Sequence, residues 1–126
     1  MLKAVIVDGS AIARGVLNTV LTEGGYEVVG LAHTSSKGFA LAQKFHPHFI
    51  CIAREQMEDG DQVVAQIRAT FPKTLIFMLA GAIDAPIVQA AVASGVQGFI
   101  VKPFKADAVL KTIRNTVLAM IRKQQG

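Results

Sequence analysis

The amino-acid sequence predicts an α/β fold in which helices cover both faces of a five-stranded parallel sheet. Five short apolar runs recur along the chain, and longer segments with the spacing of amphipathic helices separate them. Four of these runs lack alternation with polar residues, which is typical of strands that a parallel sheet buries on both faces. The regular alternation of strand and helix then indicates a doubly wound (βα)5 arrangement.

Each strand is predicted where an apolar run is bounded by polar or turn-forming residues. The predicted strands are AVIV (4–7), EVVGLA (27–32), FICIA (49–53), LIFMLA (75–80) and GFIV (98–101). In sheets of this kind, ligands and chemistry gather at the carboxyl ends of the strands. The residues at or just past those ends are Asp8, Gly9, Ala53, Ala80 and Lys102.

Five helices are predicted from apolar residues that recur on one helical face. Glycine follows the first and the fourth, and proline follows the second and the third. Asp84 is expected to cap the fourth helix, with Pro86 in its first turn. The expected ranges are Ile12 to the Gly24–Gly25 pair, Ser35–Phe45, Asp61–Phe71, Asp84–Gly95, and Ala106 to about Lys123.

Length and composition place residues 1–126 in a single folded domain. Of the 126 residues, 52% are hydrophobic and 17% are charged, so one core can form and disorder is excluded. The apolar runs are too short to span a bilayer, and the first residues indicate a strand rather than a signal peptide. Cys51 is the single cysteine and is expected to be a buried thiol. We expect a soluble cytoplasmic domain.

The net charge of +4 is concentrated in the C-terminal third of the chain. Residues 1–83 carry seven Lys or Arg and seven Asp or Glu, whereas residues 84–126 carry six Lys or Arg and two Asp. Two interpretations stay open: the basic residues form a solvated helix face, or they form a docking face for an acidic partner.

Several segments in a fixed order carry a family resemblance. They are VIVDGSAIARGVL, PHFICIA, the Asp59–Gly60 pair, FPKTLIFMLAG, ASGVQGFIVKPF and the final helix, and the most specific piece is Lys102–Pro103. With these segments the chain resembles the receiver domain of two-component response regulators, at the size of the single-domain chemotaxis type. The resemblance covers essentially the whole chain. It implies a flavodoxin-like receiver fold and a role in phosphorelay signalling.

The resemblance also implies a phosphorylation pocket, and this chain departs from the family pattern there. In active receivers, two acidic residues after the first strand and an aspartate ending the third hold Mg²⁺, and that aspartate accepts the phosphoryl group. A Ser or Thr ending the fourth strand and a Lys ending the fifth bind the phosphoryl oxygens. Asp8 and Lys102 match this pattern, but Gly9, Ala53 and Ala80 replace the second acid, the acceptor and the hydroxyl.

We therefore expect a degenerate pocket without phosphoryl chemistry and without catalytic residues. The loop REQMEDG also looks one residue shorter than the usual form and lacks its common Met-Pro. No metal site is expected, because Asp8 alone is insufficient for Mg²⁺, and no cofactor is expected.

The residues that survive in the pocket allow more than one interpretation. Asp8 and Lys102 could pair across the strand ends, or Lys102 could hold a small anionic ligand. An unpaired and partly buried lysine would be costly, which favours the pair. Glu55, Glu58 or Asp59 could supply a substitute carboxylate.

Phe99 occupies the place of the family's switch aromatic, three residues before the lysine. Small residues at the switch site leave space beside it, so an inward Phe99 would fill that space and lock one state.

The segment APIVQAAVASG (85–95) contains no charged residue, although a surface helix normally shows a polar face. It is either a deeply buried helix or a partner-binding patch. In receivers, the fourth helix, the fifth strand and the fifth helix form the surface for dimers and targets. In this chain the corresponding face would include Ile87, Val88, Lys105, Lys111, Arg114 and Arg122.

The leading hypothesis is a receiver domain that binds protein partners, or a second copy of itself, through this face without phosphorylation. The alternative hypothesis is a sensor that binds a small ligand or nucleotide near Asp8 and Lys102, but no Gly-rich phosphate loop follows the first strand. An enzyme is not expected, because no nucleophile–base pair or carboxylate pair converges. Nucleic acid is not an expected partner, because the basic residues of the last helix are few and lack interleaved aromatics. A membrane is not expected either.

Overall fold

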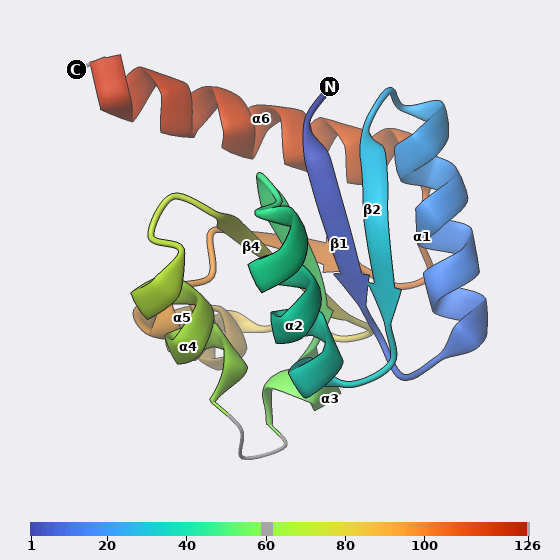
Figure 1. Cartoon of the computed structure of the whole chain (residues 1–126), viewed down its shortest axis with the longest axis horizontal. Coiled ribbons are helices and arrows are strands. Elements are labelled where there is room, and N and C mark those ends of the chain that lie inside the picture. The colour runs from blue at the N-terminus through green and yellow to red at the C-terminus, as the bar shows by residue number, and fades with distance from the viewer. Residues whose placement is uncertain (59–61, 126) are drawn as a thin grey trace.

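The computed structural model describes residues 1–58 and 62–125 and contains a five-stranded parallel sheet (Figure 1). The strand order is β2-β1-β3-β4-β5, so β2 and β5 are the edges. All five predicted strands are confirmed, with β1 one residue longer at its start. In chain order the elements are β1 (Lys3–Val7), α1 (Ala11–Glu23), β2 (Glu27–Ala32), α2 (Ser35–Phe45), β3 (Phe49–Ala53), α3 (Arg54–Met57), α4 (Val63–Thr70), β4 (Leu75–Ala80), α5 (Ala85–Ser94), β5 (Gly98–Val101) and α6 (Ala106–Gln125).

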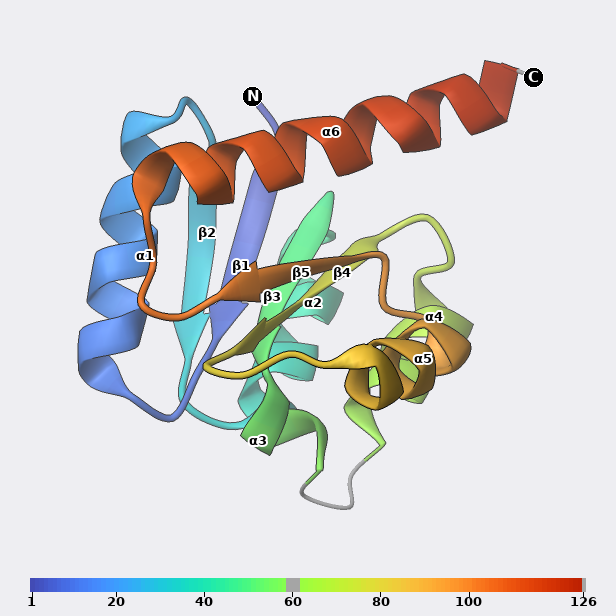
Figure 2. The ribbon, with the colours of Figure 1, turned by 180° about the vertical axis from the view of Figure 1, so that it is seen from behind.

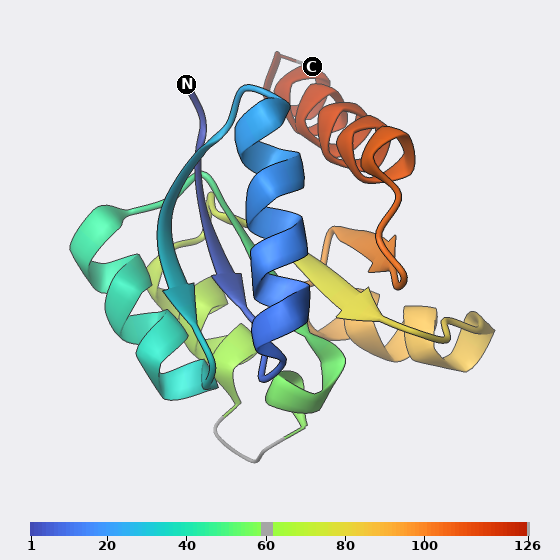
Figure 3. The same cartoon turned by 90° about the vertical axis from the view of Figure 1, so that its right-hand side faces the viewer.

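Helices cover both faces of the sheet. Figures 1 and 3 show α1 and α6 on one face and α2 on the other. Residues of α4 and α5 pack into the same core as α2. Successive residues of a strand point to opposite faces, so the sheet contributes to two cores. The α1/α6 core includes Ile6 and Phe77, and the α2/α4/α5 core includes Ile52 and Met78. Cys51 lies in the first of these cores, and burial raises the pKa of its thiol, so the predicted buried cysteine is confirmed.

The helix boundaries follow the capping signals in the sequence. α1 begins after Ser10, whose hydroxyl accepts a hydrogen bond from the Ala13 N–H at 3.2 Å. α5 begins after Asp84, whose carboxylate accepts from the Ile87 N–H at 3.0 Å. It ends at Gly95, whose φ of 116° is unfavourable for residues with a Cβ. The predicted start and stop of this helix are confirmed.

Two features of the helices differ from the sequence prediction. The four-residue helix α3 was not predicted, because a single turn is too short to show helical periodicity. α4 begins at Val63, whereas the prediction began at Asp61; Asp59, Gly60 and Asp61 lie outside the described residues.

The uncharged helix α5 is not deeply buried, so that interpretation of its composition is wrong. Within α5, all of which is described, only Ala91 is buried. Among the described residues, no helix combines the length and hydropathy needed to cross a membrane.

A polar junction anchored on Gln97 joins β4, α4 and the turn before β5. The Gln97 Oε1 atom accepts hydrogen bonds from the Ile76 N–H at 2.7 Å and from Arg68 Nη2 at 2.9 Å. Its Nε2 atom donates to the Gly95 carbonyl at 2.7 Å. Burial lowers the pKa of the Arg68 guanidinium. Ile76 is fully buried, so one side chain satisfies a main-chain donor that would otherwise be orphaned in the core.

Replacing this side chain should therefore destabilise the protein. Gln97→Leu removes the oxygen that accepts hydrogen bonds from the Ile76 N–H and from Arg68 Nη2. We expect a loss of about 1–3 kcal/mol in the free energy of unfolding. Urea denaturation followed by circular dichroism measures it. Gln43→Leu on the exposed side of α2 is the matched control and should change stability by less than about 0.5 kcal/mol. Equal losses in the two variants would contradict the role of the junction.

Candidate functional site

The strand-end residues selected from the sequence gather at one edge of the sheet. Asp8 and Gly9 follow β1, Ala53 ends β3, Ala80 ends β4 and Lys102 follows β5. These four strands are successive neighbours and all run in the same direction. Their carboxyl ends therefore form one continuous rim, which is where parallel sheets of this kind place their functional groups.

Asp8 and Lys102 form the expected ion pair across this rim. The Lys102 Nζ atom lies 2.6 Å from Oδ2 of Asp8. The carboxylate is buried and the lysine side chain is half-buried, so water screens the pair only in part. The other carboxylate oxygen, Oδ1, accepts a hydrogen bond from the Ser10 N–H at 2.9 Å. Both oxygens of the carboxylate are therefore engaged.

The main chain fixes both ends of this pair. The Asp8 N–H donates to the Ala32 carbonyl at 3.0 Å, and its own carbonyl accepts from Arg14 Nη1 at 2.7 Å. The Lys102 N–H donates to the Ala80 carbonyl at 2.9 Å, and the Lys102–Pro103 peptide bond is cis. The two charged side chains thus start from backbone positions held by neighbouring strands.

Two methyl groups occupy the strand ends between Asp8 and Lys102. Ala53 is 1% exposed and Ala80 is 3% exposed. A methyl group is neither a nucleophile nor a hydrogen-bonding group. The end of β3 and the end of β4 therefore present no side-chain oxygen to a ligand at this rim.

Gln56 of α3 lies beside Gly9, and this contact could not be predicted from the sequence. A Cβ atom added at Gly9 would lie 3.4 Å from the Gln56 Nε2 atom. The Gln56 Oε1 atom accepts a hydrogen bond from the Ser35 N–H at 3.1 Å. No motif could identify this residue, because its place depends on the unpredicted helix α3.

The acidic residues after β3, suggested as substitute carboxylates for the pocket, differ in their surroundings. Glu58 accepts a hydrogen bond from Arg54 Nε at 2.9 Å, and Glu55 is exposed. Asp59, the third residue suggested as a substitute carboxylate, lies outside the described residues. In residues 1–58 and 62–125, no group of three or more His, Cys, Asp or Glu side chains could hold a metal ion.

Phe99 is half-buried and packs against the core under α2, α4 and α5. It also lines a cavity of about 370 Å³ between β5 and α6, together with Val101, Pro103, Lys105 and Thr112. Figure 2 shows β5 on the near side of the molecule, with α6 on one side of it and α5 on the other.

The exposed apolar residues of this side differ from those selected in the sequence. Ile87 and Val88 are only half-exposed, and Ile87 packs against the core. Val92 of α5 is 54% exposed and Val101 of β5 is 55% exposed. Val92 belongs to the uncharged segment already noted, whereas Val101 ends a strand whose apolar run indicates burial.

The basic residues proposed for the same face differ in their surroundings. Lys105 lines the cavity beside β5, and Lys111 and Arg122 are exposed on α6. Burial raises the pKa of the Tyr26 hydroxyl, and the charge of Arg114 partly lowers it. Arg114 therefore acts on a residue that directly precedes β2, the edge strand opposite β5.

Breaking the ion pair from one end should destabilise the protein. Lys102→Met leaves the buried Asp8 carboxylate without its cation, and we expect a loss of about 2–4 kcal/mol in the free energy of unfolding. The double variant Asp8→Asn with Lys102→Met should recover most of that loss, because no charge remains buried. Urea denaturation measures both. A double variant as unstable as the single one would show that the loss arises from packing.

Comparisons with known proteins agree with this architecture. The sequence profile of the response regulator receiver domain matches residues 4–114. The chemotaxis protein CheY of Listeria monocytogenes is 30% identical over 114 residues, which are 90% of this chain and 96% of that protein. The structure of the chemotaxis response regulator CheY4 of Vibrio cholerae is 29% identical, with a TM-score of 0.82 over 92% of this chain and 98% of that chain.

A more distant structure has the same fold over nearly the whole chain. The CheY-like receiver domain protein of Methanospirillum hungatei JF-1 is 18% identical, with a TM-score of 0.85 and 98% of each chain covered. The predicted flavodoxin-like receiver fold is confirmed, and the chain belongs to the response regulator receiver domain family.

Proposed function

We propose that this receiver domain acts in two-component signalling as a protein-interaction module that does not depend on phosphorylation. The observation that carries the proposal is the composition of the strand-end rim. Ala53 ends β3 and Ala80 ends β4, both as buried methyl groups, and Lys102 is already paired with Asp8 at 2.6 Å. This rim has no side chain that could accept a phosphoryl group at the end of β3.

The residues present do not fit a magnesium ion. Mg²⁺ requires oxygen ligands in near-octahedral geometry and gives up its water reluctantly. Asp8 is the one carboxylate that the rim offers among the described residues, and both of its oxygens are engaged by Lys102 and Ser10. Gly9 and Ala53 contribute no side-chain oxygen. The proposed function therefore does not involve a metal ion.

The ion pair also bears on switching. A ligand shifts a conformational equilibrium only by binding one state more tightly than the other. Lys102 already has an anion in Asp8, at hydrogen-bonding distance and in a partly buried setting. The strand-end sensor hypothesis has weaker support for the same reason, because an incoming anion would have to displace this carboxylate.

The surface around β5 is the favoured site of interaction. We define the β5 face as Val92, Val101, Lys105 and Lys111, which lie on α5, β5, the following loop and α6. Its two valines are more than half exposed, both lysines are exposed, and Lys105 lines the same cavity as Val101. Apolar groups at the centre with charges at the rim are the usual anatomy of a protein interface. The expected partner therefore presents an apolar patch bordered by carboxylates.

Exposure to a small phosphodonor should leave the protein unmodified. After incubation with acetyl phosphate and Mg²⁺, intact-protein mass spectrometry should show an unchanged mass, because the end of β3 lacks a nucleophile. An active receiver protein treated in parallel verifies the reagent. A stable adduct of one phosphoryl group would refute the proposal.

Charge reversal on the β5 face should release the partner. In pull-downs with tagged protein, Lys105→Glu with Lys111→Glu should weaken capture roughly tenfold, because rim charges steer association with an acidic surface. Lys37→Glu with Lys44→Glu, at two exposed positions of α2, is a control of equal charge change that leaves this face intact. Self-association through the same face is measured by analytical ultracentrifugation of the same variants. Equal losses in both double variants would indicate a nonspecific charge effect and contradict this location.

A further inference from the structure

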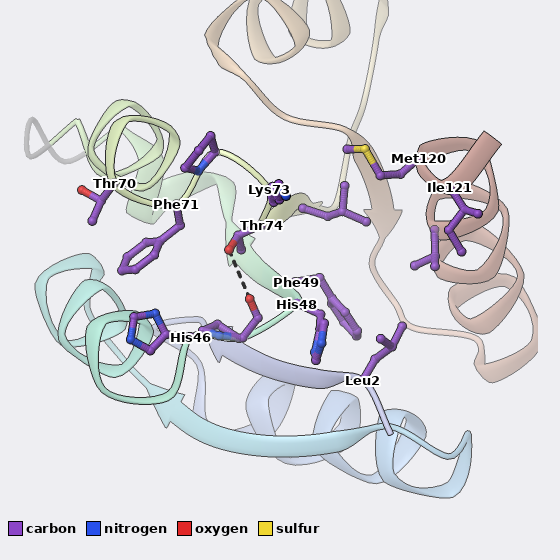
Figure 4. A pocket seen from close by; sticks show the side chains of 14 residues that line it. Leu2, His46, His48, Phe49, Thr70, Phe71, Lys73, Thr74, Met120 and Ile121 are labelled. Carbon is purple, nitrogen blue, oxygen red and sulfur yellow. Dashed lines mark hydrogen bonds between the residues drawn. The ribbon is translucent and has the colours of Figure 1, made fainter. Parts of the chain in front are cut away.

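A second concave site lies at the opposite edge of the sheet, where the strands begin. It is a groove of about 530 Å³ between α6 and the turns that precede β3 and β4 (Figure 4). Its lining residues extend from His46 and Phe71 at one end to Met120 and Ile121 at the other. This volume lies within the range of about 300–1,000 Å³ that is usual for small-molecule sites.

The floor and one wall of the groove are apolar. Phe49 and Leu75, the first residues of β3 and β4, form part of the lining, and both are buried in the α1/α6 core. Met120 and Ile121 come from α6. These elements are far apart in the sequence, and the fold brings them together around the groove. An apolar body placed here would remove exposed hydrocarbon from water.

All ionisable side chains among the described residues that line the groove are basic. Among the described residues that line it, these are His46, His48 and Lys73, and no carboxylate is present. The basic residues Arg122 and Lys123 directly follow Ile121 on α6 and are exposed. An anion at this edge therefore meets positive charge and no opposing carboxylate in the lining.

His48 is oriented to donate a hydrogen bond. Its Nδ1 atom accepts the Lys3 N–H at 2.9 Å, so neutral His48 carries its ring proton on Nε2. That N–H has no acceptor among the described hydrogen bonds of this side chain. The Thr74 hydroxyl, by contrast, already donates to the Pro47 carbonyl at 3.1 Å, which Figure 4 shows as a dashed line.

We propose that this groove binds an amphipathic monocarboxylate, with its hydrocarbon body against Leu2, Met120 and Ile121 and its carboxylate between His48 and Lys73. The combination of an extended apolar floor with bases alone at the rim matches a ligand with one apolar end and one anionic end. A second copy of this chain is a poor occupant, because it would bring the same basic residues to the same edge. The site goes beyond the proposed interaction function and uses none of the residues of the β5 face.

The test is a titration of the isotope-labelled protein with decanoate, below the concentration at which decanoate forms micelles. Backbone and methyl NMR signals of Thr74, Met120 and Ile121 should shift in a saturable way, while signals of Val92 and Val101 stay unchanged. Decylammonium, which has the same chain length and the opposite charge, should bind at least about tenfold more weakly.

Two matched variants locate the site. Ile121 and Leu118 are both 43% exposed on α6, but only Ile121 is among the residues that line the groove. Ile121→Glu places a carboxylate inside the groove and should abolish decanoate binding, whereas Leu118→Glu should leave it within about twofold of wild type. Lys73→Glu should weaken it by about tenfold or more. Circular dichroism confirms that each variant folds.

Three outcomes would overturn the proposal: no saturable shift with decanoate, equal binding of decylammonium, or equal loss of binding in Ile121→Glu and Leu118→Glu. Because the groove and the β5 face share no residue, failure here leaves the partner pull-down unaffected, and failure of that pull-down leaves this titration unaffected.

Discussion

The ion pair between Asp8 and Lys102 is the interaction on which the carboxyl edge of the sheet depends. Its partners follow β1 and β5, which are separated in the sheet by β3 and β4. The pair therefore spans the ends of two intervening strands, and those ends carry Ala53 and Ala80. A buried carboxylate is costly without a cation, so Asp8 depends on Lys102.

The ion pair also limits how Lys102 can respond to a new negative charge. A working switch needs two arrangements of similar free energy, and an effector that binds one of them better. Here Lys102, the cation that would respond to an added negative charge, is already paired with Asp8. A main-chain hydrogen bond to Ala32 of β2 holds Asp8 in place. The half-buried Phe99 packs on the core beside the edge strand. The rim thus holds the ends of β1 and β5 together through a buried carboxylate and its cation.

The sequence predicted the sheet well because buried parallel strands require continuous apolar runs, and such runs are local signals. It also favoured the ion pair, because the family resemblance places Asp8 and Lys102 in one pocket and an unpaired, partly buried lysine would be costly. It did not predict α3, whose four residues are too few for a periodic pattern, and consequently missed Gln56 beside Gly9. Nor could it tell Ile87 from Val92, because an uncharged helix lacks the polar stripe that marks its outer side.

The groove between α6 and the turns that precede β3 and β4 could not be predicted from the sequence either. Its lining joins the first residues of two strands, two turns and the end of the last helix, and the apolar members of that set look like ordinary core residues in the chain. What distinguishes them is only that α6 passes over the start of the sheet without closing the space beneath it. Figures 1 and 2 show this helix continuing past the edge of the sheet to the C-terminus.

Helix α6 has a further consequence, because its residues contribute to two separate surfaces. Its first turns border the β5 face through Lys111, and its later turns wall the groove through Met120 and Ile121. A helix is stiff along its axis, so a ligand that tilts one end must displace the other. Any such coupling is reciprocal. If a ligand in the groove raises the affinity for a partner at the β5 face, the bound partner must raise the affinity for the ligand by the same factor. One helix can thus couple the proposed partner surface to the proposed ligand groove.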